Sequence, residues 1–213
     1  LGELCPSMRV WFDRRRCAGL YVDANALVLQ FEYLMRICRM NLITKKDITE
    51  LTVIERMSET LARRGPDRVG TYADGPVAFG HRRLAIIDLS ASSDQPMVDT
   101  ALSLALVFNG TIYNYRELRA ELISMGYAFV SEGDSEVILK AYAAWGEQCV
   151  QRFYGMFAFA IYDRRDQTLF LCRDRFGVKP LFYAAIPDGS ILFGSELKAL
   201  TAHPALRRSG SSR

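Results

Sequence analysis

One segment of the chain, GMFAFAIYD at residues 155–163, is apolar at almost every position. Successive side chains of a β-strand point to opposite faces, so a strand without a polar face must be buried on both sides. The segment therefore predicts a packed layer above and below its sheet. A sheet-on-sheet core with helices outside provides those layers.

Further segments rich in β-branched and aromatic residues predict more strands. The polar stretch DRRDQ at 163–167 separates the apolar strand from the next one and predicts an antiparallel hairpin. We expect the two last strands to extend this hairpin. In chain order, the expected strands span residues 77–88, 102–108, 156–162, 168–172, 181–184 and 191–194.

Helix signals occur between and before these strands. Asp47 followed by Glu50 forms a capping-box pattern, and Gly126 and Gly146 are typical helix stops. Apolar residues at helical spacing follow each start signal. The expected helices span residues 48–63, 114–126 and 135–145, with a short fourth at 147–154.

Composition excludes several classes of function. With 213 residues, 50% of them hydrophobic, the chain can bury a full core without disulfides or a structural metal. The net charge of +3 comes from scattered Lys and Arg, so no nucleic-acid or membrane partner is expected. The apolar run at 24–37 contains charged residues and is too short to span a bilayer. Five cysteines without close pairing indicate a reducing compartment, and we expect a cytoplasmic protein.

Eight motifs follow one another along the chain, and a set in fixed order is far more specific than one short pattern. They are RRGPD (63–67), GHRRLAIIDLS (80–90), QPM (95–97), FNGTIYNYRELRAEL (108–122), GDSEVILKAY (133–142), GMFAFAIYD (155–163), RDRFGVKPLFY (173–183) and SELKAL (195–200). In this order they resemble the class II glutamine amidotransferase domain. That domain stands at the front of glutamine-hydrolysing asparagine synthetases and occurs in relatives that amidate polysaccharides or dipeptides.

The resemblance implies an α+β fold of the N-terminal-nucleophile hydrolase type, a four-layer α/β/β/α sandwich of two antiparallel sheets between helices. It also implies hydrolysis of free glutamine to glutamate and ammonia, with the ammonia passed to a synthetase active site. The chemistry is acyl transfer, in which a thiolate attacks the carboxamide and a tetrahedral oxyanion forms. No cofactor is implied for this domain, because ATP and Mg belong to the synthetase domain, which this sequence does not contain.

The resemblance assigns the carboxylate end of glutamine to Arg83, because a guanidinium donates two parallel hydrogen bonds to one carboxylate. Local sequence alone favours an exposed strand residue at Arg83, and the surrounding motifs reverse that interpretation. The next four residues match a segment that borders the substrate through its backbone, and simple core packing is the alternative. They are Leu84, Ala85, Ile86 and Ile87.

Asn109 and Gly110 match the oxyanion hole of the family, formed by the Asn amide and the Gly backbone N–H. The alternative is a tight turn, for which Asn-Gly is a common sequence. Asp134 matches the carboxylate that accepts the substrate ammonium, and by local pattern it is also a helix N-cap. Thr111 replaces the usual glutamate of the family, which removes a second acceptor for that ammonium.

The nucleophile is not identified by the sequence. The family begins with Cys-Gly-Ile about thirty residues ahead of RGPD, and its free α-amino group serves as the base. Cys38 lies nearest to that spacing, whereas Cys17-Ala18-Gly19-Leu20 looks more like the motif. Each would need cleavage of the residues before it. The alternative for both is a small buried hydrophobe.

Other motif residues have structural interpretations. Arg173 and Asp174, with Gly177 and Pro180, are expected to form an ion pair and a turn. His81 lies in an expected strand without a partner motif, so no metal site is expected.

The sequence predicts three parts: an irregular N-terminal segment at 1–45, the amidotransferase domain at 46–204 and a tail at 205–213, the outer two not matching the family. We interpret the chain as a truncated or frame-shifted copy. The expected function is a glutaminase domain for an ATP-dependent synthetase, in cis or in trans, that makes asparagine from aspartate. Alternatives are a non-catalytic glutamine-binding remnant, a degraded product without function, and an amidotransferase subunit for polysaccharide or peptide amidation. The resemblance suggests a homodimer for the complete enzyme.

Overall fold

A computed structural model describes residues 8–10, 27–29, 36–41, 51–186 and 190–206, and all its paired strands are antiparallel. The largest sheet has six strands. From edge to edge these are β1 (Met8–Val10), β3 (Arg36–Asn41), β9 (Thr168–Arg173), β8 (Gly155–Asp163), β7 (Leu104–Ile112) and β6 (Met97–Asp99).

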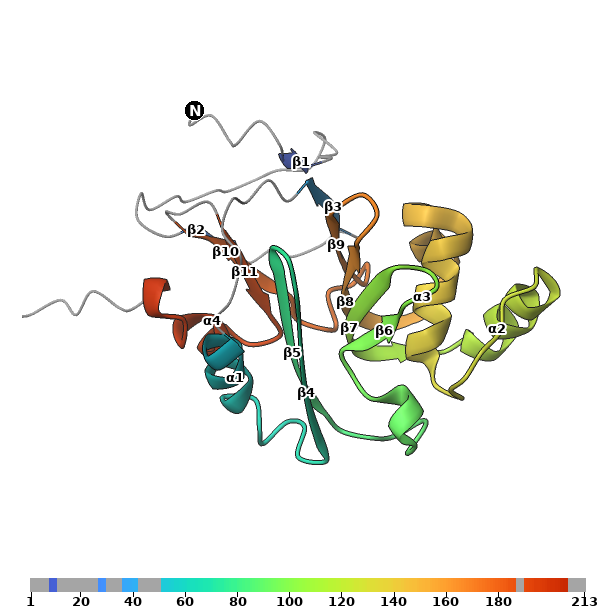
Figure 1. Cartoon of the computed structure of the whole chain (residues 1–213), viewed down its shortest axis with the longest axis horizontal. Coiled ribbons are helices and arrows are strands. Elements are labelled where there is room, and N and C mark those ends of the chain that lie inside the picture. Colours follow the sequence, from blue (N-terminus) through green and yellow to red (C-terminus); the bar gives the residue numbers. More distant parts are fainter. Residues whose placement is uncertain (1–7, 11–26, 30–35, 42–50, 187–189, 207–213) are drawn as a thin grey trace, which may run out of the picture.

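Two smaller sheets form the second β-layer (Figure 1). They are the three-stranded β11 (Ile191–Gly194), β10 (Phe182–Ala185) and β2 (Leu27–Leu29), and the hairpin of β4 (Arg68–Asp74) and β5 (Val77–Arg83). Helices α2 (Tyr115–Ser124) and α3 (Asp134–Trp145) lie on the side of the six-stranded sheet, and α1 (Leu51–Glu59) and α4 (Leu197–Thr201) lie on the opposite side. Three short 3-10 helices are η1 (Ala91–Ser93), η2 (Gly146–Arg152) and η3 (Pro204–Leu206).

The alternation along β8 confirms the predicted four-layer α+β sandwich. Phe159 and Ile161 pack into the cluster beneath α2 and α3, whereas Ala160 and Tyr162 pack into the cluster between the β-layers. Every residue of β8 from Phe157 onward is buried. Neither face of this strand reaches water, as the apolar sequence requires.

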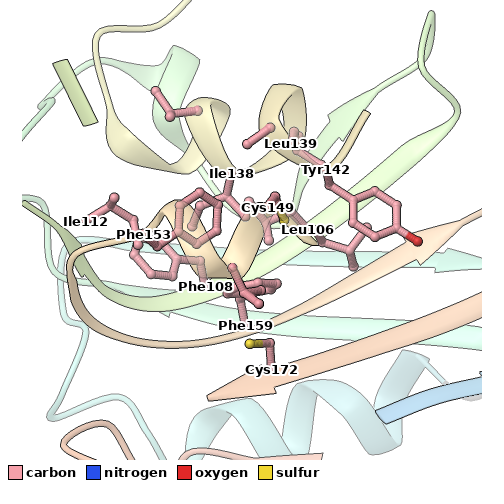
Figure 2. Close-up of a cluster of buried hydrophobic side chains, with 14 of the residues drawn as sticks. Leu106, Phe108, Ile112, Ile138, Leu139, Tyr142, Cys149, Phe153, Phe159 and Cys172 are labelled. Carbon is pink, nitrogen blue, oxygen red and sulfur yellow. The ribbon is translucent and has the colours of Figure 1, made fainter. Parts of the chain in front are cut away.

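Two cysteines belong to the helix-side core, together with side chains of α3 (Figure 2). Cys149 and Cys172 are both fully buried. Burial raises the pKa of the Cys149 thiol to about 12 and raises that of Cys172 well above its usual value. Because a thiol must ionise to attack or bind metal, both are packing residues.

Several predicted boundaries differ from the structure. β5 ends at Arg83 instead of residue 88, and β7 continues through Asn109 and Gly110 to Ile112. The expected short helix at 147–154 is the 3-10 helix η2. α2 begins after Asn114, whose side chain binds the backbone of Arg152 and Tyr154 instead of capping the helix.

β10 and β11 do not extend the β8–β9 hairpin as predicted, but belong to the second layer. The chain changes layer at a turn organised by the buried carboxylate of Asp174. It accepts backbone N–H groups of Phe176, Val178 and Lys179, at 2.9 to 3.1 Å. The Arg173 guanidinium donates to the carbonyls of Gly177 and Lys179, so both residues shape this turn.

The first predicted helix is present as α1, although its start signals Asp47 and Glu50 lie outside the described residues. Strands β1, β2 and β3 lie within residues 1–45 and were not predicted. Where the domain begins therefore stays a prediction. No helix among the described residues is long and apolar enough to cross a membrane.

His81 of β5 joins the two β-layers. Its Nε2 lies 3.1 Å from the carbonyl oxygen of Phe108 in β7, and its buried Nδ1 has no partner among the described residues. Burial lowers the pKa of His81 to about 4, and the nearby Arg83 charge acts in the same direction. The fold therefore requires a neutral imidazole with its proton on Nε2.

This pKa shift predicts acid sensitivity. His81 stays neutral in the fold but gains a proton in the unfolded chain below pH 6.5, so stability present at neutral pH is lost as pH falls toward 4. We expect about 2 kcal/mol less unfolding free energy at pH 5 than at pH 7 from this group. Urea unfolding at each pH should show a shallower dependence in His81→Gln. His203→Gln, at the only other histidine, is the control, and an unchanged slope in His81→Gln would contradict the assignment.

Candidate functional site

The candidate site lies along one edge of β7. The neighbouring strand β6 pairs only with residues 104–106. Beyond residue 106, side chains instead of a strand accept hydrogen bonds from the backbone N–H groups of β7. The Phe108 N–H donates to Gln95 Oε1 at 2.6 Å, and the Ile112 N–H donates to Asp134 Oδ2 at 2.9 Å. Amides of alternate residues in a strand point to the same edge. The N–H of Gly110 therefore points to this edge, between two amides that already have acceptors.

Asn109 and Gly110 lie within a strand, so the alternative of a tight turn is wrong. Gly110 has φ +153° and pairs with Phe157, and a Cβ there would lie 2.1 Å from the carbonyl oxygen of Met156. Only glycine fits this close approach of backbones. Every second side chain of a strand lies on the same face, so Asn109 shares the face of Ala105 and Val107. Ala105 and Val107 pack against the second β-layer.

Asp134 is the first residue of α3 and is only 6% exposed. The N-cap position belongs to Gly133, so the predicted side-chain cap at Asp134 is wrong. Its carboxylate reaches across to β7 instead, where it accepts the Ile112 N–H. Burial raises the pKa of Asp134, and hydrogen bonds from the amides of Ile112, Asp134 and Ser135 oppose that shift.

Arg83 ends β5 and is only 7% exposed, so the alternative of a solvent-facing arginine is wrong. Its Nη1 donates to Ser90 O at 3.0 Å and to Asp94 Oδ1 at 2.7 Å, and its Nη2 donates to the Asp88 carbonyl. A guanidinium has five N–H donors. Among the described residues, these contacts leave the Nε–H and one Nη2–H, a pair that suits a carboxylate.

The residues after Arg83 form a loop instead of the expected strand. Leu84 and Ile86 are 55% and 75% exposed, so the alternative of core packing is wrong for them. Ile87 is also exposed, and Ala85 is held at its backbone, where its N–H donates to Asp67 Oδ2 at 2.9 Å. The segment therefore lies at the surface, and its role beside the substrate stays a prediction.

Contacts between side chains and backbone join the elements that carry the predicted site residues. His81 links β5 to β7, one residue before Asn109. Gln95 donates to Ser135 Oγ at 3.3 Å and so links β7 to the start of α3. Asp88 accepts the Glu132 N–H at 2.9 Å, two residues before Asp134. The elements that carry Arg83, Asn109 and Asp134 are thus joined by hydrogen bonds, and we call these contacts the hydrogen-bonded frame.

Sequence reasoning missed Gln95 and Asp88 as parts of this frame. Both lie within quoted motifs, QPM and GHRRLAIIDLS, and Asp88 is the one charged residue among the apolar and small residues at 84–93. That contrast was the available signal. Thr111 lies next to Gly110 in β7, opposite Met156.

The structure does not bring a thiol to this frame among the residues it describes. Cys17 lies outside the described residues. Cys38 lies within β3, opposite Leu171 of β9, whereas Asn109 lies in β7. Three strand spacings separate β3 from β7, about 14 Å, which is beyond the reach of a cysteine side chain. The described residues also contain no group of three His, Cys, Asp or Glu that could hold a metal ion.

Comparison with known proteins matches residues 37–212 to the family described as glutamine amidotransferase domain. Glutamine-hydrolyzing asparagine synthetase 3 of Bacillus subtilis (strain 168) is 42% identical over 165 residues, covering 76% of this chain and 26% of the relative. Asparagine synthetase 1 of the same strain is 43% identical over 148 residues, covering 70% and 23%. The chain spans about a quarter of the length of these relatives.

The fold is also similar to a solved structure. Glutamine phosphoribosylpyrophosphate amidotransferase from B. subtilis, in complex with ADP and GMP, matches with a TM-score of 0.53 and 25% sequence identity. The match covers 62% of this chain and 30% of that one. The chain belongs to the glutamine amidotransferase domain family and has its N-terminal-nucleophile hydrolase fold.

Proposed function

We propose that this domain binds free glutamine at the edge of β7 and hydrolyses it to glutamate and ammonia. In this proposal Arg83 binds the α-carboxylate, Asp134 accepts the α-ammonium, and the side chain of Asn109 and the N–H of Gly110 bind the carboxamide oxygen. One observation carries the proposal: the Gly110 amide points to the same edge as the buried Asp134 carboxylate. Thr111 adds no carboxylate, so Asp134 is the acidic group for the ammonium.

The hydrolytic half of the reaction needs a thiolate and a base. Attack on the carboxamide carbon would place negative charge on its oxygen, and a preorganised N–H donor stabilises that charge. Cys149 and Cys172 are excluded as nucleophiles because burial keeps their thiols protonated. The sequence offers two candidates for the nucleophile. Cys38 is three strands away from β7 and would have to move to reach the substrate. Cys17 lies outside the described residues, so its role as nucleophile stays a prediction.

The relatives suggest where the ammonia goes. They are asparagine synthetases, and the match covers about a quarter of each of them. We propose that the ammonia serves a synthetase domain, in cis or in trans, which binds ATP and Mg and makes asparagine from aspartate in the cytoplasm, within a homodimer of the complete enzyme. Amidation of a polysaccharide or peptide is the alternative use.

A second candidate is a glutamine-binding domain without hydrolysis. The observation that favours it is the position of Cys38, within the sheet and away from Asn109. Binding and hydrolysis are therefore tested separately.

We expect the purified chain, with its N-terminus verified by mass spectrometry, to release glutamate from glutamine. A thiol-directed glutamine analogue should block the release, because the mechanism requires a thiolate. Glutamate is measured with a coupled dehydrogenase assay. Glutamine binding without turnover would leave the non-catalytic alternative, and neither binding nor turnover would refute the proposed site.

Replacing Arg83 should weaken glutamine binding. Loss of charge-assisted hydrogen bonds to a carboxylate typically costs about 1.5–3 kcal/mol, so Arg83→Ala should bind at least about tenfold more weakly by calorimetry. Arg83→Lys should restore little, because an ammonium cannot reproduce the paired donors. Arg82→Ala is the matched control, since Arg82 pairs with Glu59 outside the site. Equal affinity in Arg83→Ala and Arg82→Ala would contradict the role of Arg83.

A further inference from the structure

We propose that Asp88 is a positioning residue that fixes the separation between Arg83 and Asp134, the two groups that hold the α-carboxylate and the α-ammonium of glutamine. This inference rests on the proposed function and deepens it. Asp88 directly follows the proposed substrate-bordering segment 84–87. Some of its hydrogen bonds support Arg83, and others lead to the start of α3 near Asp134.

One set of contacts runs toward Arg83. The carbonyl oxygen of Asp88 accepts from Arg83 Nη2. Its Oδ1 accepts the N–H of Ser90 at 2.8 Å, and the carbonyl of Ser90 in turn accepts from Arg83 Nη1 at 3.0 Å. The Asp88 carboxylate thus closes the turn that holds the buried guanidinium in place.

The other set runs toward Asp134. Oδ2 of Asp88 accepts the Ser93 hydroxyl at 2.7 Å and the Glu132 N–H at 2.9 Å. Gly133, between Glu132 and Asp134, packs closely on the same residues, because a Cβ built on it would lie 2.6 Å from Ser93 Oγ and 3.7 Å from Asp88 Cβ. One carboxylate therefore ties the arginine turn to the start of α3.

An ionised carboxylate is what these contacts require. Three donors converge on its two oxygens, whereas an asparagine would turn its NH₂ group toward at least one donor. The same hydrogen bonds, that of Ser93 foremost, hold the pKa of Asp88 well below its usual range, so it is charged at neutral pH. The α-carboxylate and the α-ammonium of glutamine are attached to the same carbon atom, so the distance between them is fixed. If Arg83 moves relative to Asp134, at least one of the two contacts with glutamine weakens.

The test uses two ligands and the full chain. Glutamine needs both partners, whereas 4-carbamoylbutanoate, which is glutamine without its α-amino group, needs Arg83 but not Asp134. By calorimetry, Asp88→Asn should weaken glutamine binding about tenfold and the analogue by less than about threefold. A merely structural loss would weaken both ligands by the same factor, so the ratio of the two affinities is the readout.

Two further variants keep the test interpretable. Ser93→Ala removes one donor to Asp88 and should change the ratio in the same direction by a smaller factor, which also decides the case if Asp88→Asn fails to fold. Asp163→Asn is the matched control: its Oδ1 accepts the Arg165 N–H at 3.0 Å, but it lies opposite Leu104, about 17 Å along β7 from Asn109. The ratio should stay at the wild-type value there.

The outcomes separate the two proposals. A wild-type ratio in both Asp88→Asn and Ser93→Ala, with glutamine still bound, would overturn the positioning role and leave the proposed function standing. Failure of the unchanged chain to bind glutamine would overturn the proposed function and this inference with it.

Discussion

The site depends on how the backbone amides along one edge of β7 find acceptors. β6 covers that edge only as far as residue 106, and a buried amide left without an acceptor costs about 1–3 kcal/mol. Side chains replace the missing strand, with Gln95 at Phe108 and Asp134 at Ile112. The ladder on the other edge continues without interruption, so Gly110 keeps strand geometry with its N–H turned away from β8. A fixed amide of this kind needs no reorganisation to bind a developing negative charge.

The side chains that satisfy this edge also join the layers of the sandwich. His81 extends from the second β-layer to the Phe108 carbonyl, and Gln95 connects the Phe108 amide to Ser135 at the start of α3. Phe108, the residue directly before Asn109, is therefore linked both to the second β-layer and to α3. Residues that belong to four different segments of the chain are thus linked by hydrogen bonds around Phe108, and such support helps to position a binding site.

The sequence predicts this architecture correctly where a local pattern is compatible with only one structural arrangement. The two-sided apolar pattern of β8 requires two covering layers, and the structure has them. The end of β5 was predicted wrongly because Leu84 to Ile87 have strand-like composition, while the hydrogen bonds that fold the chain around Arg83 come from Asp88 and Ser90. Gln95 and Asp88 were missed because their partners are distant: Ser135 lies 40 positions from Gln95, and Glu132 lies 44 positions from Asp88.

Charge explains why the proposed ligand is an α-amino acid and not a simple amide. Arg83 is buried with part of its donors engaged by Asp94 and by backbone carbonyls, and Asp134 is buried with its pKa raised by desolvation. A ligand with only a carboxamide would offer no carboxylate to the remaining donors of Arg83 and no cation to Asp134 in a poorly solvated site. A zwitterion supplies a carboxylate to the first and an ammonium to the second, and the ammonium favours the ionised form of Asp134. Binding and ionisation of Asp134 are therefore coupled, and each strengthens the other.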